Sequence, residues 1–137
     1  MFFNKNKNNN KKDDLIKVSA LLIHAAKIDE NYTTQEEEII KQALSTIGAN
    51  KEDIEYLIEE GKKIEKDTNH ILDFTKQVKN MDNDSKIKII KTLWRIIFSN
   101  KNADMYETNL MRRLAGLLYV DSKTMGVIKE QIKKENS

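Results

Sequence analysis

Cysteine and proline are absent from this 137-residue sequence, and glycine occurs only four times. A chain without cysteine forms no disulfide, binds no metal through thiolates and performs no thiol catalysis. The scarcity of glycine and proline removes the residues that tight turns between strands need, whereas the abundant lysine, glutamate, leucine and isoleucine suit helices. Composition therefore predicts an all-α protein that is long enough to bury one hydrophobic core.

Positive charge is concentrated at the start of the chain. The first fourteen residues contain four lysines and two aspartates, which account for the whole formal net charge of +2. The remainder is formally neutral, so the basic field of a nucleic-acid-binding domain is missing and we expect no nucleic-acid partner. Residues 1–12 are rich in asparagine and lysine and have little to bury. We therefore expect a disordered arm there, followed by a single domain from residue 13 to residue 137.

Long hydrophobic runs are also lacking. The longest apolar stretch, from Ala20 to Ala26, contains His24 and is too short to cross a bilayer. The segment Met1–Phe3 is too short for the apolar part of a signal peptide. We therefore expect a soluble cytoplasmic protein, in which Phe2 and Phe3 with their neighbouring lysines allow at most a peripheral membrane contact.

Hydrophobic residues recur at helical spacing through most of the chain. Thr33 and Glu36 have the spacing of a capping box, and Gly48 stands where a left-handed C-terminal cap is expected. The segment Ser85–Phe98 is apolar on more than one side, so we expect it to be the main core element. The periodicity predicts about seven helices, over approximately residues 14–28, 34–47, 51–64, 68–78, 85–98, 104–118 and 122–132.

The chain also resembles itself at one constant offset. The loop positions Asp29, Asn31, Thr33 and Glu36 fall on Asn100, Asn102, Asp104 and Glu107. Core and cap positions match at the same offset, as Ile23 does with Trp94, Ile40 with Met111 and Asn50 with Asp121. Because chance alignment of amphipathic helices does not also match loops and caps, we expect two helical units. They are related by a pseudo-twofold axis and joined by a central helix, the fourth.

Two segments carry a resemblance to a known family. The first is an apolar helix followed by Ala26-Lys27-Ile28-Asp29-Glu30, then by Glu36-Glu37 and a helix that ends at glycine. The second runs from Tyr106 to Val120. Both resemble the tellurite-resistance TerB-like proteins, and the likeness extends from about Leu15 to the C-terminus. The chain is also similar to the N-terminal domain of a membrane-anchored, DjlA-type J-domain co-chaperone.

The resemblance implies an all-helical domain with internal duplication. It also implies a divalent-metal site at the acidic loops, carried here by Asp29 and Glu36, with Asn100 and Glu107 as the second pair. The resemblance also suggests that the chain acts in a stress or envelope-related response.

The residue types of the first loop fit a hard cation such as Ca²⁺ or Mg²⁺, which prefers oxygen ligands at alternating loop positions. The candidate ligands are Asp29, Asn31, Thr33, Glu36 and Glu37. A weaker second set is Asn100, Asn102, Asp104 and Glu107, in which a neutral asparagine beside Lys101 replaces the first aspartate. The alternative reading is structural: Thr33 and Glu36 cap a helix, and Asp29 accepts hydrogen bonds from the amides at its N-terminus.

No catalytic constellation is visible in the sequence. His24 and His70 are the only histidines, they lack a ligand spacing, and His24 matches Arg95 in the other unit, which predicts a helix-surface position. The cluster around Trp94 is predicted to be core, and the sequence has no glycine-rich phosphate loop. We therefore expect a non-enzymatic module that binds a protein partner, without catalytic or cofactor-binding residues. The alternatives are a metal-dependent hydrolase that uses Asp29 and Glu36 and a membrane-surface adaptor that uses the N-terminal arm.

Overall fold

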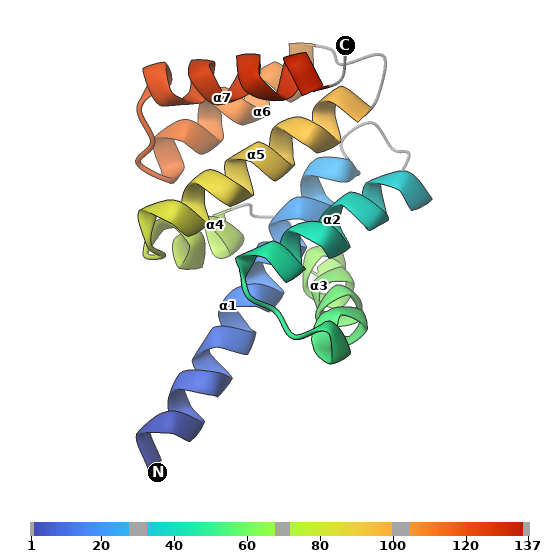
Figure 1. Cartoon of the computed structure of the whole chain (residues 1–137), viewed down its shortest axis with the longest axis vertical. Helices are drawn as coiled ribbons and strands as arrows, with labels where there is room; N and C mark the ends of the chain where they lie inside the picture. The colour runs from blue at the N-terminus through green and yellow to red at the C-terminus, as the bar shows by residue number, and fades with distance from the viewer. Residues whose placement is uncertain (1, 28–32, 68–71, 100–104, 136–137) are drawn as a thin grey trace.

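The computed structural model describes residues 2–27, 33–67, 72–99 and 105–135, with side chains described over 12–27, 33–67, 73–99 and 109–135. These residues form seven α-helices and one short 3-10 helix and contain no strand, which confirms the all-α fold class (Figure 1). None of the described helices is both long and apolar enough to cross a membrane. The helices are α1 (Phe2–Ala26), α2 (Thr34–Ile47), η1 (Lys51–Asp53), α3 (Ile54–Asp67), α4 (Leu72–Lys79), α5 (Asn83–Ser99), α6 (Met105–Leu117) and α7 (Ser122–Glu135).

Helix α1 lies at the centre of the bundle. Nearly every side chain from Leu15 to Ala26 is buried, and the helix contacts α2, α3, α4 and α5. Helix α5 is the second large contributor to the core, as expected from its sequence, and buries residues such as Ile89, Leu93 and Ile97. The periodicity predicts one apolar stripe on α1, whereas the structure covers this part of the helix on all sides.

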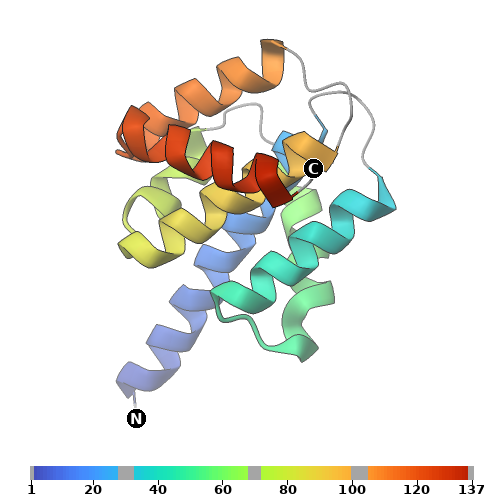
Figure 2. The same ribbon diagram turned by 45° about the horizontal axis from the view of Figure 1, so that its top comes forward.

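The start of α1 also differs from the sequence expectation. The helix begins at Phe2, and not near Asp14, and its first turns project away from the other helices (Figures 1 and 2). These turns coincide with the segment for which the sequence predicts a disordered arm. The disorder of residues 1–12 in solution and the domain boundary at residue 13 stay predictions.

Helices α2 and α6 end in the same way. Gly48 and Tyr119 both have a left-handed backbone, with φ of 119° and 57°. The next amide reaches back in the same pattern at each end: Ala49 N donates to Leu44 O over 2.9 Å, and Val120 N donates to Ala115 O over 2.9 Å. The cap predicted at Gly48 is confirmed. The equivalent ends agree with the predicted repeat, although the internal duplication and its pseudo-twofold axis stay predictions.

Carboxylates begin two of the other helices. At α5, the Asp82 carboxylate accepts hydrogen bonds from the Ser85 hydroxyl (2.7 Å) and the Ser85 amide (3.2 Å). At α7, Asp121 Oδ1 accepts one from the Thr124 amide over 2.6 Å, as the predicted cap requires. By contrast, Asn50 occupies the position before η1 without making a side-chain cap hydrogen bond. The caps predicted at Thr68 and Asp104 lie outside the described residues.

Helices α1 and α3 are in tight contact at Gly61. A Cβ atom added to Gly61 would lie 2.5 Å from Ser19 Oγ and 2.9 Å from Ser19 Cβ. Glycine is therefore required here by space, since any side chain would force the two helices apart. The Ser19 hydroxyl is fully buried and has no hydrogen-bond partner, which adds a cost that the surrounding packing must offset.

Gly61→Ala is expected to destabilise the protein by roughly 1–3 kcal/mol, because the added methyl group overpacks the contact with Ser19. A mid-helix glycine with open space around it behaves in the opposite way, and Gly126 in α7 has no atom within 4 Å of an added Cβ. Gly126→Ala should therefore stabilise by about 0.5–1 kcal/mol through the better helix propensity of alanine. Urea unfolding of both variants measures the two signs. A stabilised Gly61→Ala protein would contradict the close packing of α1 on α3.

Asp121→Asn is expected to flatten the acid limb of the stability profile. Hydrogen bonds from Thr124 hold the pKa of the Asp121 carboxyl below its usual range. A lowered pKa in the folded state gives stability that is present above the unfolded-state pKa and is lost as the pH falls through the folded-state pKa. Asparagine keeps the acceptor and removes the titration. Urea unfolding from pH 6 down to pH 2 measures the effect, with Glu130→Gln, which changes an exposed carboxylate on the same helix, as the control.

Candidate functional site

The predicted cation site lies where the chain passes from α1 into α2. Asp29 and Asn31 lie outside the described residues, whereas Thr33, Glu36 and Glu37 lie within them. In the weaker second set, Asn100, Asn102 and Asp104 lie outside the described residues, as does the side chain of Glu107. The geometry of the site is therefore that of its three described residues at the start of α2.

Thr33 and Glu36 form the predicted capping box. Glu36 Oε1 accepts hydrogen bonds from the Thr33 amide and from the Thr33 hydroxyl, both over 3.0 Å, and the Glu36 amide donates to Thr33 Oγ1 over 3.1 Å. The Glu36 residue is only 4% exposed. A buried carboxylate is costly unless hydrogen bonds and favourable charges surround it, and the N-terminus of α2 supplies both.

Glu37 forms ion pairs with lysines of α2 and α3. Its carboxylate lies 2.9 Å from Lys62 Nζ on α3 and 4.0 Å from Lys41 Nζ on α2. Lys41 in turn lies 2.8 Å from the Glu55 carboxylate on α3. The hydrogen bond that Lys62 donates to Glu37 raises the pKa of Lys62, and the one that Lys41 donates to Glu55 raises the pKa of Lys41. These pairs join the first turns of α2 to α3.

The described oxygen atoms are of the types that bind a hard cation, but they already take part in hydrogen bonds or ion pairs within the protein. Carboxylate and hydroxyl oxygens are the ligand types that Ca²⁺ and Mg²⁺ take. Thr33 and Glu36 bond to each other, however, and two lysines lie beside Glu37. Over residues 12–27, 33–67, 73–99 and 109–135, no three acidic or histidine side chains cluster as a metal site would require. A cation at this loop therefore depends on Asp29 and Asn31 to complete its ligand set.

A second polar cluster connects α1 with α3. The Glu65 carboxylate lies 2.9 Å from Lys27 Nζ and 3.4 Å from His24 Nδ1. The His24 ring also lies 6.2 Å from the Phe74 ring on α4, at an angle of 56°. Its side chain is 30% exposed, so His24 is more enclosed than the surface position predicted for it. This cluster pairs polar groups across the interface between α1 and α3.

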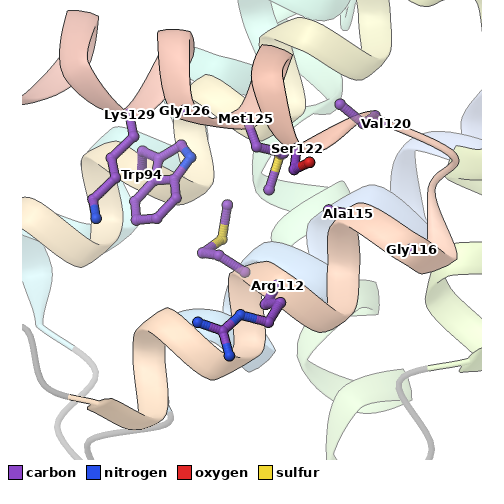
Figure 3. Close-up of a pocket in the computed structure, with 10 residues that line it drawn as sticks. Trp94, Arg112, Ala115, Gly116, Val120, Ser122, Met125, Gly126 and Lys129 are labelled. Carbon is purple, nitrogen blue, oxygen red and sulfur yellow. The ribbon is translucent and has the colours of Figure 1, made fainter.

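Sequence reasoning missed a cavity between α5, α6 and α7 (Figure 3). It has a volume of about 440 Å³, which falls within the range of small-ligand pockets. Trp94 forms one wall and is 4% exposed, in agreement with the prediction that it belongs to the core. Gly116 and Gly126 lie in the walls, and no atom would be within 4 Å of a Cβ added at either residue. The signal in the sequence was two glycines within predicted helices, Gly116 near the end of one and Gly126 inside the next.

The comparison with protein families agrees with this architecture. A family model described as "Tellurite resistance protein TerB" matches residues 15–130. The chain belongs to the TerB family. The match begins at Leu15, a buried residue of α1, and ends within α7, so the TerB region contains the capping box, the polar clusters and the cavity. No curated protein and no solved structure matched the chain. The similarity to the DjlA-type co-chaperone therefore stays a prediction.

Thr33→Ala is expected to destabilise this TerB domain by about 1 kcal/mol, because it removes the hydroxyl that accepts from the Glu36 amide. Thr34, the next residue, is exposed and lies in the first turn of α2. Thr34→Ala is the matched control and should change stability by no more than about 0.5 kcal/mol. Thermal unfolding followed by circular dichroism measures both. Equal losses in the two variants would rule out the capping box as the specific device that starts α2.

Proposed function

We propose that this TerB-family chain is a non-enzymatic, cytoplasmic helical module that binds a protein partner in a stress or envelope-related response. In this proposal the first acidic loop takes Ca²⁺ or Mg²⁺, and the cation tunes the binding of the partner. The observation that carries the proposal is the burial of Glu36 at the end of that loop. Its carboxylate is held in a fixed orientation by Thr33, next to a segment that contains Asp29.

The proposed ligand set is centred on Asp29 and Glu36, with Asn31 and Thr33 between them. A cation at this position would neutralise part of the negative charge that gathers before α2. The cation and the N-terminus of α2 would then stabilise these carboxylates together. Glu37 would join the set only by leaving Lys62, so we assign it a secondary role. The second loop, with Asn100 and Lys101, is the weaker candidate because it offers less negative charge.

The ion pairs of Glu37 suggest how a cation would act at a distance from the loop. They link α2 to Lys62 on α3, and Lys41 extends the link to Glu55. The next residue, Tyr56, is 51% exposed. Tyrosine is enriched among residues that anchor protein interfaces. We therefore place the partner on the face that α2 and α3 share around Tyr56, where weaker pairing of Glu37 would alter the local charge.

Titration with Ca²⁺ and Mg²⁺ to millimolar concentration, followed by the amide signals of the protein in NMR spectra, tests the proposal. We expect saturable shifts at Thr33, Glu36 and Glu37, with smaller shifts at Lys62 and Tyr56. Asp29→Asn and Glu36→Gln should each weaken binding by at least about tenfold, since each removes a charged ligand. Unchanged spectra at millimolar cation would remove the metal from the proposal.

Two controls make this result specific. Glu52→Gln removes an exposed carboxylate of η1, away from the loop, and should leave the affinity for the cation unchanged. Glu37→Gln should keep the shifts at Thr33 and abolish those at Lys62 and Tyr56, because it cuts the proposed link to α3. The same preparation assayed against phosphoester and peptide substrates addresses the hydrolase alternative. That alternative and the membrane-surface adaptor stay predictions.

A further inference from the structure

The cavity between α5, α6 and α7 is lined by apolar residues and by charged residues of one sign only. Its apolar walls come mainly from Trp94, Met111, Ala115, Val120 and Met125. The charged side chains among its lining residues are Arg112 and Lys129, and both are cations. Among the residues whose side chains the structure describes, no carboxylate lines it, and Ser122 is the sole lining side chain that offers a hydrogen-bond acceptor of ordinary strength. A ligand that complements these walls is apolar in its body and negatively charged at one end.

The two cations lie on opposite walls of this cavity. Figure 3 shows Lys129 descending from α7 beside the Trp94 ring and Arg112 extending to the left across α6, with both charged ends toward the same side of the view. Lys129 Nζ lies 5.5 Å from the centroid of the Trp94 ring. Arg112 is exposed, so its guanidinium is accessible to an anion at the mouth. Arginine binds carboxylates in a bidentate manner, and lysine adds a second charge-assisted contact.

The wall that Trp94 forms is apolar. Trp94 Nε1 is buried and has no hydrogen-bond partner in the described residues. Figure 3 shows this nitrogen on the edge of the ring that faces away from Lys129. Because this donor is buried, the indole offers a ligand an apolar surface, which suits a hydrocarbon body. Met111 and Met125 are flexible and polarisable side chains that can move to admit such a ligand.

The sequence of the first half differs at two positions that matter for the cavity. At the constant offset found in the sequence, Ala115 matches Leu44 and Lys129 matches Ile58. Leu44 and Ile58 are fully buried, with 0% and 1% exposure, so the matched positions of the predicted repeat carry large buried apolar side chains in the first half. The second half has a smaller residue at one position and a cation at the other. The space and the positive charge therefore arise at the same place.

We propose that this cavity binds a medium-chain fatty acid, with the aliphatic chain against Trp94 and the two methionines and the carboxylate between Arg112 and Lys129. The volume of about 440 Å³ accommodates a chain of roughly ten carbons. This proposal is independent of the cation site at the first loop, because it rests on α5, α6 and α7 alone. A cationic amphiphile is excluded by the charges at the mouth, and a fatty alcohol lacks the group that those charges recognise.

Titration of the intact protein with decanoate, below the micellar concentration, tests the proposal. Trp94 is the only tryptophan, so one indole N–H signal in the NMR spectrum and the intrinsic fluorescence both report on the cavity wall. We expect a saturable shift of this signal with decanoate. Decanol should bind about tenfold more weakly and decyltrimethylammonium not measurably. Equal affinity for decanol and decanoate would overturn the assignment of the carboxylate, and no saturable shift with decanoate would overturn the site.

Matched variants locate the ligand. Gly126→Leu places a side chain in the open space of the cavity and should abolish the shift, whereas Val127→Leu on the exposed face of the same helix should leave it unchanged. Arg112→Gln should weaken binding of decanoate about tenfold and leave decanol unaffected. Arg113→Gln, an exposed neighbour that does not line the cavity, is its control. Undiminished decanoate binding in folded Gly126→Leu and in Arg112→Gln would place the ligand elsewhere. Tighter binding of an acylated peptide with a C-terminal leucine than of decanoate would also overturn the choice of ligand.

Discussion

The burial of α1 on all sides is the constraint on which the rest of this structure depends. A helix that hides nearly every side chain from Leu15 to Ala26 needs neighbours around its whole circumference, and α2, α3, α4 and α5 provide them. Helix α3 packs tightly against it, because Gly61 lets its backbone approach Ser19. At the end of α1, His24 and Lys27, the residue that follows the helix, both meet the same carboxylate, that of Glu65 on α3. Ser19, in contrast, is buried at the contact with Gly61 without a hydrogen-bond partner among the described residues.

The ends of the helices decide where the functional groups stand. At the start of α2, one hydroxyl and one carboxylate bond to each other and to two amides, and this arrangement buries Glu36 while its neighbour Glu37 turns to α3. At the end of α6, Tyr119 adopts a left-handed backbone that costs a non-glycine residue about 1 kcal/mol or more. Its ring stays 73% exposed beneath Lys79 Nζ, which lies 4.7 Å from the ring centroid. The turn that follows leads into α7 and sets one edge of the cavity.

Sequence patterns predicted the features that depend on neighbours along the chain. The capping box at Thr33 and Glu36, the left-handed cap at Gly48 and the cap at Asp121 each need only three or four consecutive residues, and the structure contains all three. The helical periodicity likewise predicted all seven helices. Features that depend on distant segments were not accessible in this way. The complete burial of α1 reflects four other helices, and the enclosed position of His24 depends on Glu65 and Phe74.

The two candidate sites differ in the same way: one depends on a local sequence pattern, and the other depends on the packing of distant segments. The cation site was predicted from alternating oxygen ligands in a local segment, of which the structure describes only the end. The cavity left no comparable pattern, because a mid-helix glycine such as Gly126 has the same appearance in a sequence whether it faces solvent, a tight contact or open space. Gly61 and Gly126 illustrate the difference, since one touches Ser19 and the other touches nothing. Only the packing of each helix on its neighbours, that of α3 against α1 and that of α7 against α5 and α6, distinguishes them.

The two halves of the sequence differ in charge at matched positions. The first half has Asp29, Glu30 and the glutamates Glu36–Glu38, and it buries Leu44 and Ile58. The second half replaces the loop aspartate by Asn100, adds Lys101, and exchanges the two filling residues for Ala115 and Lys129. If the halves share one architecture, then two exchanges occur together in the second half. The exchange at the loop weakens a cation site, and the exchange in the helices opens an apolar cavity with positively charged side chains at its mouth. A single scaffold would then serve two ligands of opposite charge, because small changes in side-chain volume and charge leave the helix contacts in place.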